Sequence, residues 1–126
     1  MVITKVIIAG SREFTDYALL EKKCDKILKD IPKDKLIIVS GKCSGADLLG
    51  EHYAKSRGIP IEEFPADWNK HGKAAGPIRN KQMAYYASHL IVFWNGNDKG
   101  GSINMIKQAR EQGLTIRIIE YLKYER

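Results

Sequence analysis

Short apolar segments alternate with longer amphipathic ones along this chain of 126 residues, and this alternation is the feature that most restricts its fold. The apolar segments are rich in β-branched residues, and the first is almost wholly apolar from Val6, as in strands buried on both faces of a parallel sheet. The third contains Pro60, Glu62 and Glu63, which are typical of an edge strand. We predict strands at residues 2–9, 36–39, 59–64, 90–94 and 115–120.

Between these strands, apolar residues recur at steps of three and four, which indicates helices. The first helix is expected to follow a cap at Thr15 or Asp16 and to end before Pro32. The second is expected to begin with Ser44 and Asp47 as a capping pair and to end at Gly58. The other predicted segments are helices at 77–87 and 102–112, an irregular stretch at 66–75 with at most a short helix, and a polar tail at 121–126.

This order of elements predicts an α/β fold. Strands separated by helices favour an open, doubly wound parallel sheet with helices on both faces. Right-handed crossovers make 3-2-1-4-5 the expected order of its five strands. Because the sequence contains no repeat, linker or low-complexity segment, we expect residues 1–126 to form one domain.

Charge and composition restrict the class of partner and the compartment. The net charge of +6 favours an anionic partner. Many lysines alternate with acidic residues on predicted helix faces, however, so nucleic-acid binding is permitted without being indicated. The longest apolar runs are too short to cross a bilayer, and the first residues lack a signal-peptide pattern. Cys24 and Cys43 have neither disulfide nor metal-site spacing. We therefore expect a cytoplasmic protein without a membrane partner.

Polar and glycine-rich segments follow the predicted strands. In a doubly wound sheet the ligand lies beyond the carboxyl ends of the strands, where the winding changes direction between the first and fourth strands. Glycines there permit close backbone approach, helix N-termini supply N–H donors, and arginines supply fixed charge, which together suit a phosphate. The predicted ligand-binding residues are Gly10, Ser11, Arg12, Ser40, Gly41, Gly45, Ala46, Asp47, Arg79, Asn80, Trp94, Asn95, Gly96, Gly100, Gly101 and Ser102.

Two of these residues have specific predicted roles. Arg79 follows Pro77 in the first turn of a predicted helix, where its guanidinium could bind a phosphate through two hydrogen bonds. Trp94 could stack on a base or pack in the core at its strand end. The sequence contains neither a G-x-G-x-x-G motif nor a G-x-x-x-x-G-K-[ST] loop, which disfavours an ordinary NAD-binding protein or P-loop NTPase. His52, His71 and His89 do not form a ligand cluster, so we expect no metal and no cofactor.

Four stretches carry a resemblance to a known superfamily: residues 6–14, 39–47, 64–80 and 93–105. They resemble the SLOG superfamily, which groups the DNA-processing DprA/Smf proteins with the LOG phosphoribohydrolases. The match is closest to its YspA/YpsA-related branch of bacterial and phage proteins. The resemblance implies a Rossmann-like sheet that binds a nucleotide or a nucleotide-derived ligand. It also implies assembly into dimers or higher oligomers.

The resemblance extends only partly to catalytic residues. LOG enzymes have an arginine before strand four, which Arg79 resembles, and a catalytic Glu in the P-G-G-x-G-T-x-x-E motif that follows that strand. In this chain Gly101 and Ser102 resemble the Gly-Thr step, but Met105 occupies the place of the Glu. A thioether cannot accept a proton as a carboxylate does. The catalytic candidates are therefore Asp47 and Arg79, and Glu13 and Asp67 are further carboxylates that could substitute.

Three functions follow from these observations. The first is a nucleotide-binding sensor or sequestering module without chemistry of its own. The second is a nucleotide hydrolase that cleaves the N-glycosidic bond, with Arg79 on the phosphate and Asp47 as the acid–base residue. The third is a protein associated with single-stranded DNA, suggested by the net charge and the relationship to DprA. The chain lacks the aromatic–basic alternation of a stacking platform, which disfavours the third.

Overall fold

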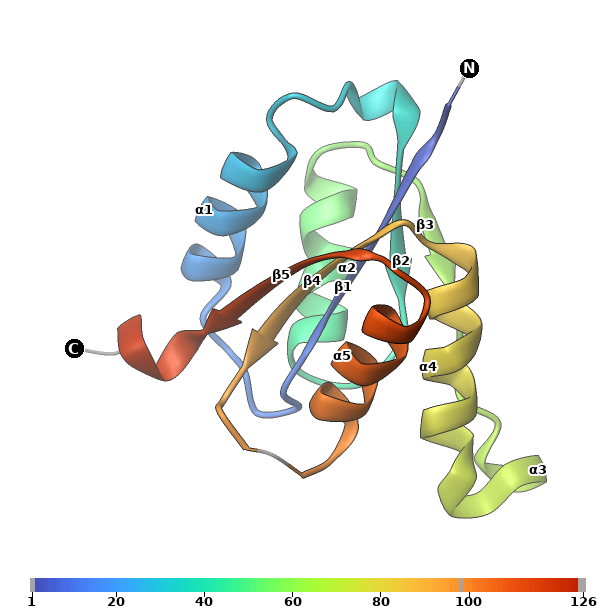
Figure 1. The fold of residues 1–126 in the computed structure, drawn as a ribbon. Helices are drawn as coiled ribbons and strands as arrows, with labels where there is room; N and C mark the ends of the chain where they lie inside the picture. Colours follow the sequence, from blue (N-terminus) through green and yellow to red (C-terminus); the bar gives the residue numbers. More distant parts are fainter. Residues whose placement is uncertain (1, 98, 125–126) are drawn as a thin grey trace.

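The computed structural model describes residues 2–97 and 99–124, and it confirms the predicted doubly wound sheet (Figure 1). All pairs of neighbouring strands are parallel, in the predicted order β3-β2-β1-β4-β5. The first and third strands are shorter than predicted. The strands are β1 (Thr4–Gly10), β2 (Leu36–Ser40), β3 (Ile61–Glu63), β4 (His89–Trp94) and β5 (Thr115–Glu120).

The four long helices are α1 (Tyr17–Leu28), α2 (Ala46–Ser56), α4 (Ala75–Tyr86) and α5 (Gly101–Glu111). Helices α1 and α2 cover one face of the sheet, and α4 and α5 cover the other (Figure 1). None of the helices in the described ranges is long and apolar enough to cross a membrane. The short elements are η1 (Lys33–Lys35), α3 (Trp68–His71), η2 (Gly72–Ala74) and η3 (Tyr121–Tyr124).

The core has two parts because side chains along β1 point alternately to the two faces of the sheet. Val6 and Ile8 pack with α1 and α2, whereas Ile7 and Ala9 pack with α4 and α5. Gly50 lets α2 approach the sheet closely, since a Cβ there would lie 2.7 Å from Cγ2 of Ile8. This close packing holds the middle of α2 against β1.

The starts of α1 and α2 differ in how well they were predicted. Asp16 caps α1, as expected, and its Oδ1 accepts a hydrogen bond from the Leu19 N–H at 3.1 Å. The capping pair Ser44–Asp47 is wrong, because the N-cap of α2 is Gly45, with φ at 79° and no side-chain hydrogen bond. A Cβ at Gly45 would lie 2.3 Å from the backbone oxygen of Ser11. Contact with the β1–α1 loop therefore requires glycine at this position.

Two other expectations need correction. Helix α4 begins at Ala75 instead of Pro77, because η2 runs directly into it. Pro77 still lies in the first turn, where its missing N–H is not needed. The tail after β5 is not wholly polar, since Tyr121 is buried and its ring lies 4.7 Å from that of Phe14, centroid to centroid.

Candidate functional site

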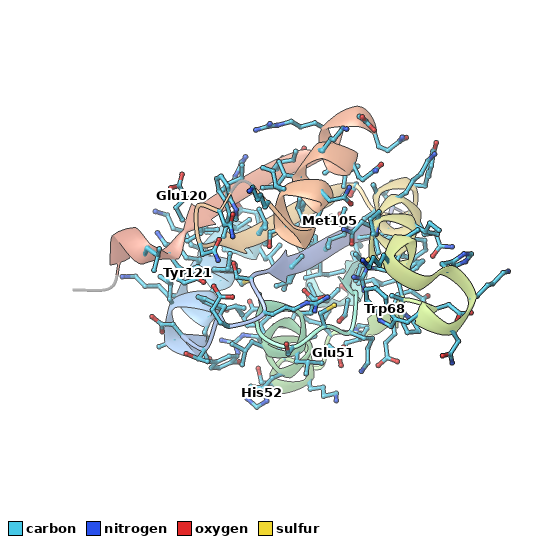
Figure 2. All side chains as sticks on the ribbon, turned by 90° about the horizontal axis from the view of Figure 1, so that it is seen from below. Glu51, His52, Trp68, Met105, Glu120 and Tyr121 are labelled. Carbon is cyan, nitrogen blue, oxygen red and sulfur yellow. The ribbon has the colours of Figure 1, made fainter. Side chains whose placement is uncertain are left out.

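A cleft of about 440 Å³ opens at the carboxyl ends of β1 and β4, in the size range of small-molecule sites. Figure 2 looks onto this end of the sheet. The chain turns to opposite faces after these two strands, so their loops separate and leave a space between them. The lining consists of Ala9, Gly10, Ser11, Arg12, Glu13, Cys43, Asp47, Arg79, Asn80, Met83, Trp94, Asn95, Asn97, Lys99, Gly100, Gly101, Ser102 and Met105.

Most of the predicted ligand-binding residues lie along this one cleft. They are Gly10, Ser11, Arg12, Asp47, Arg79, Asn80, Trp94, Asn95, Gly100, Gly101 and Ser102. The other predicted residues do not line it: Ser40, Gly41, Gly45, Ala46 and Gly96. Gly41 and Gly45 instead shape the wall, since Gly41 accepts a hydrogen bond from Arg79 and Gly45 contacts the β1–α1 loop.

The floor of the cleft is formed by backbone. A Cβ at Gly10 would lie 2.2 Å from the oxygen of Phe93 and 2.9 Å from Cβ of Ala46, so β1, β4 and α2 meet here without room for a side chain. The Ser11 N–H donates to the oxygen of Phe93 at 3.0 Å. The Asn95 N–H in turn donates to Oγ of Ser11 at 3.2 Å. These bonds tie the β1–α1 loop to the β4–α5 loop.

Positively charged groups line the cleft. Arg12 and Lys99 are exposed and line it, together with the first residues of α5. The N-cap of this helix is Gly100, which has φ at 99° and no side chain to bind the helix N–H groups. The first N–H groups of a helix have no partners within the helix and carry partial positive charge. The cleft can therefore hold an anion beside these groups.

Arg79 is more buried than a surface phosphate ligand would be, at 6% exposed. Its Nη1 donates to the backbone oxygen of Gly41, and its Nε donates to Oδ1 of Asn80 at 2.9 Å. Its Nη2 lies 3.5 Å from Sγ of Cys43. Arg79 therefore joins α4 to the β2–α2 loop and forms one end of the cleft.

Asn80 extends this connection to the start of α5. Its Nδ2 donates to Oδ1 of Asn104 at 3.0 Å and to the backbone oxygen of Gly101 at 3.3 Å. Asn80 thus fixes the start of α5 relative to α4. The Arg79–Asn80 pair was predicted as a ligand-binding helix start. In the structure the pair joins α4 to the β2–α2 loop and to the start of α5.

Asp47 is the buried carboxyl group of the cleft, at 5% exposed. Its Oδ2 accepts a hydrogen bond from the Cys43 N–H at 3.2 Å. Burial raises the pKa of Asp47 to about 6, and Glu51 adds to this, whereas the Cys43 N–H and the Arg79 guanidinium oppose it. A carboxyl group that titrates near neutral pH has the property that general acid–base chemistry requires.

The other two candidate carboxylates have structural partners. Glu13 lines the cleft, and its Oε1 accepts hydrogen bonds from Oη of Tyr121 at 2.7 Å and from Nδ2 of Asn95 at 2.8 Å. These bonds, that of Tyr121 first, lower the pKa of Glu13. Asp67 caps α3 by accepting from the Lys70 N–H at 3.1 Å, and it does not line the cleft.

Apolar residues cover the side of the cleft beneath α5. Met105 is 2% exposed and packs with Met83 in the core, so the position that resembles the LOG glutamate presents a thioether. Trp94 packs against the same cluster, and its Nε1 donates to the oxygen of Asn97 at 2.7 Å. Its indole N–H is therefore occupied within the β4–α5 loop.

A buried ionic group behind Asp47 was missed from the sequence. Glu51 is 4% exposed, its Oε2 accepts from Oγ of Ser40 at 2.7 Å, and its Oε1 lies 3.0 Å from Nζ of Lys42. The same Nζ reaches Oε2 of Glu63 at 3.2 Å. A signal was present, since Glu51 follows Asp47 by four residues and so shares the inner face of α2. The cleft is also lined by residues that were not in the list of predicted ligand-binding residues: Ala9, Cys43, Met83, Asn97 and Lys99.

The histidines lie apart. His52 packs edge-on against Tyr17, with ring centroids 4.8 Å apart, and Nδ1 of His89 lies 2.7 Å from Oγ of Ser88. His71 ends α3. In the ranges that the structure describes, no three His, Cys, Asp or Glu residues are grouped as metal ligands would be.

Comparison with known proteins identifies the family. The YspA, cpYpsA-related SLOG family matches residues 4–71, which is more than half of the chain. The chain belongs to this family. The matched segment contains the loops after β1 and β2, whereas Arg79 and the start of α5 lie beyond it. The predicted membership of the SLOG superfamily is confirmed.

Two individual proteins are similar to this SLOG chain. Gene 61 protein of Mycobacterium phage D29 is 26% identical over 117 residues, which cover 89% of this chain and 93% of the phage protein. The DNA processing protein A (DprA) of Streptococcus pneumoniae has a similar structure, with a TM-score of 0.71 and 18% identity over 93% of this chain. The chain spans 50% of that DprA chain. At this identity the likeness to DprA shows the fold alone.

Proposed function

We propose that this SLOG-family protein binds a nucleotide or nucleotide-derived small molecule through its phosphate and acts as a sensor or sequestering module. The observation that carries the proposal is the uncapped start of α5, which lines a cleft together with Arg12 and Lys99. Helix N–H groups and cationic side chains converge there on one space. A phosphate is a strong acceptor for both.

The cleft favours binding over chemistry. Met105 replaces the carboxylate that the resemblance to LOG enzymes would require, and Glu13 is held by Tyr121 and Asn95. The hydrogen-bonding groups of Arg79 contact the protein itself. Among the lining residues that the structure describes, Asp47 is the one buried carboxyl group, so catalysis would depend on it.

Thermal unfolding in the presence of AMP, ADP, ADP-ribose and adenosine tests the proposal. A ligand at 100 times its Kd stabilises the folded state by about 2.7 kcal/mol, which raises Tm by several degrees. We expect the phosphate-bearing compounds to raise Tm, adenosine to have a smaller effect, and every compound to be recovered unchanged. Arg12→Gln should reduce the shift, whereas Lys26→Gln, an equal charge change on the exposed side of α1, should not. Failure of every phosphate-bearing compound to shift Tm would contradict the proposal.

Nucleotide hydrolysis at the N-glycosidic bond is the second candidate, and the position of Asp47 favours it. This carboxyl group lies in the cleft with its pKa raised to about 6, so it can exchange a proton near neutral pH. Incubation with nucleotides should then release free base, and Asp47→Asn should abolish the release. Recovery of intact nucleotides from the wild-type protein would eliminate this function.

Association with single-stranded DNA is the third candidate. It rests on the net charge of +6 and on the DprA-like fold, since DprA is a DNA processing protein. Such binding would weaken steeply with salt concentration, because cations are released from the phosphates. Absence of binding to an oligothymidylate at low salt would remove this candidate.

A further inference from the structure

Trp68, the first residue of α3, is an aromatic side chain that is 50% exposed. A Cβ at Gly76 would lie 3.5 Å from Cη2 of Trp68 and 3.9 Å from Nη2 of Arg79. The indole ring and the guanidinium therefore both lie next to Gly76. Arg79 lines the cleft, and its Nη2 contacts Cys43, another lining residue. Trp68 is not itself one of the lining residues, but its exposed ring lies next to Arg79, at the end of the cleft that Arg79 forms.

The position of Trp68 is set by local hydrogen bonds. Asp67 accepts from the Lys70 N–H at 3.1 Å, and the backbone oxygen of Asp67 accepts from the His71 N–H at 3.0 Å. Gly72, with φ at 57°, ends α3 and leads through η2 into α4. Figure 2 shows Trp68 beside the yellow-green α3, away from Glu120 and Tyr121 on the other side of the molecule. The backbone of α3 is thus held next to the start of α4, while half of the Trp68 surface remains open.

We propose that Trp68 is the stacking platform for the base of the bound ligand. This inference rests on the proposed function and specifies its ligand class: a nucleoside phosphate whose base lies toward α3 and whose phosphate lies toward Arg12, Lys99 and the start of α5. An indole ring offers a large flat apolar face, and base–aromatic stacking accepts any base. Purines bind more tightly than pyrimidines, because their larger ring system covers more of the indole.

Trp68 thereby takes the role that the sequence suggested for Trp94. The Trp94 ring packs in the core cluster beneath α5, and its N–H is bound to Asn97. Trp68 retains an open face. Trp94 also lines the cleft, but its ring already packs on the core, whereas Trp68 is half exposed and has more apolar surface left for a base to cover.

Calorimetric titration of AMP and ribose 5-phosphate separates the base from the phosphate. We expect Trp68→Ala to weaken AMP binding about tenfold and to leave ribose 5-phosphate binding unchanged. Trp68→Phe should retain most of the AMP affinity, because a smaller aromatic face remains. Tyr85→Ala, which removes another exposed ring from α4, should change neither titration. AMP should also quench the fluorescence of the wild-type protein more than that of Trp68→Phe.

The outcomes distinguish this inference from the proposed function. If the wild-type protein binds both compounds and Trp68→Ala leaves AMP binding intact, the stacking role is wrong and phosphate binding stands. Equal weakening of both compounds by Trp68→Ala would also overturn the stacking role, since it indicates a general change in the cleft. If the wild-type protein binds neither compound, both proposals fail. Loss of oligothymidylate binding in Trp68→Ala with AMP binding unchanged would overturn the inference in favour of a DNA surface.

Discussion

Oγ of Ser40 donates a hydrogen bond of 2.7 Å to Oε2 of Glu51, which joins the carboxyl end of β2 to the inner face of α2. Both residues are buried, and Oε1 of the same carboxylate binds Nζ of Lys42. Lys42 has φ at 65°, a backbone conformation that residues other than glycine rarely adopt. This group of contacts holds the β2–α2 loop, which carries the hydrogen-bond donor to Asp47.

The first prediction concerns the stability contributed by Glu51. Glu51→Ala leaves the buried Ser40 hydroxyl without its acceptor and should lower the free energy of unfolding by about 2 kcal/mol. Glu51→Gln, which retains an acceptor oxygen, should cost less. Glu63→Gln, at the exposed end of the same Lys42 contact, serves as control and should leave the urea midpoint nearly unchanged. Equal effects of the changes at Glu51 and Glu63 would contradict the buried role of Glu51.

The second prediction concerns Asp47 and pH. Its pKa is raised from 3.8 to about 6 in the folded protein, so the folded state holds the proton more tightly than the unfolded state does. The contribution of Asp47 to the free energy of unfolding therefore falls as pH rises from about 4 to about 6, by up to about 3 kcal/mol. The free energy of unfolding of Asp47→Asn, measured by denaturation across this range, should not show this fall. The variant Asp34→Asn, at an exposed position, should still show it. Parallel profiles for wild type and Asp47→Asn would show that Asp47 does not titrate there.

The third prediction concerns the contact between Tyr121 and Glu13. Tyr121→Phe keeps the ring packed on Phe14 and removes the hydroxyl that binds Glu13, which should cost about 1 kcal/mol of stability. That hydrogen bond is the largest cause of the lowered pKa of Glu13, so the pKa should rise toward 4.5 in the variant. NMR titration of the Glu13 side chain measures this. Tyr85→Phe is the control, and an unchanged Glu13 titration in Tyr121→Phe would refute the assigned contact.

The fourth prediction concerns the floor of the cleft. Gly10→Ala places a Cβ 2.2 Å from the Phe93 oxygen and should displace β1 from β4, at a cost of more than about 3 kcal/mol. In Gly113→Ala the alanine must also adopt a positive φ, 75°, but its Cβ meets no atom within 4 Å. This variant should therefore lose only about 1 kcal/mol of stability. Thermal unfolding compares the two variants. A smaller loss at Gly10 than at Gly113 would show that this contact is not tight.

The fold could be predicted because its determinants are local. Apolar β-branched runs and helical periodicity identified the strands and long helices, and right-handed crossovers fixed the strand order. The cap at Asp16 and the glycine after α2, Gly58 with φ at 67°, are also encoded within a few residues. Such local signals can be recognised in a single sequence.

The details of the site depended on contacts between distant segments. Gly45 is the N-cap of α2 because it contacts Ser11, a residue of another loop, and no local pattern indicates that contact. The burial of Arg79 arises from its hydrogen bond to Gly41, 38 residues earlier in the chain. Likewise, Tyr121 is buried because its ring packs on Phe14, and its hydroxyl binds Glu13, 108 residues earlier in the chain. Such long-range packing cannot be read from periodicity or turn chemistry.

The central claim, that the start of α5 binds a phosphate, is tested most directly by NMR of the ¹⁵N-labelled protein. Titration with AMP should shift the amide signals of Gly101 and Ser102, because their N–H groups lie at the uncapped helix start beside the cleft. Adenosine at the same concentration should leave these two signals in place, and Gly113, at the far end of the helix, should respond to neither compound. Shifts of Gly101 and Ser102 that require the phosphate are the predicted result. AMP that leaves both signals unmoved would contradict the claim.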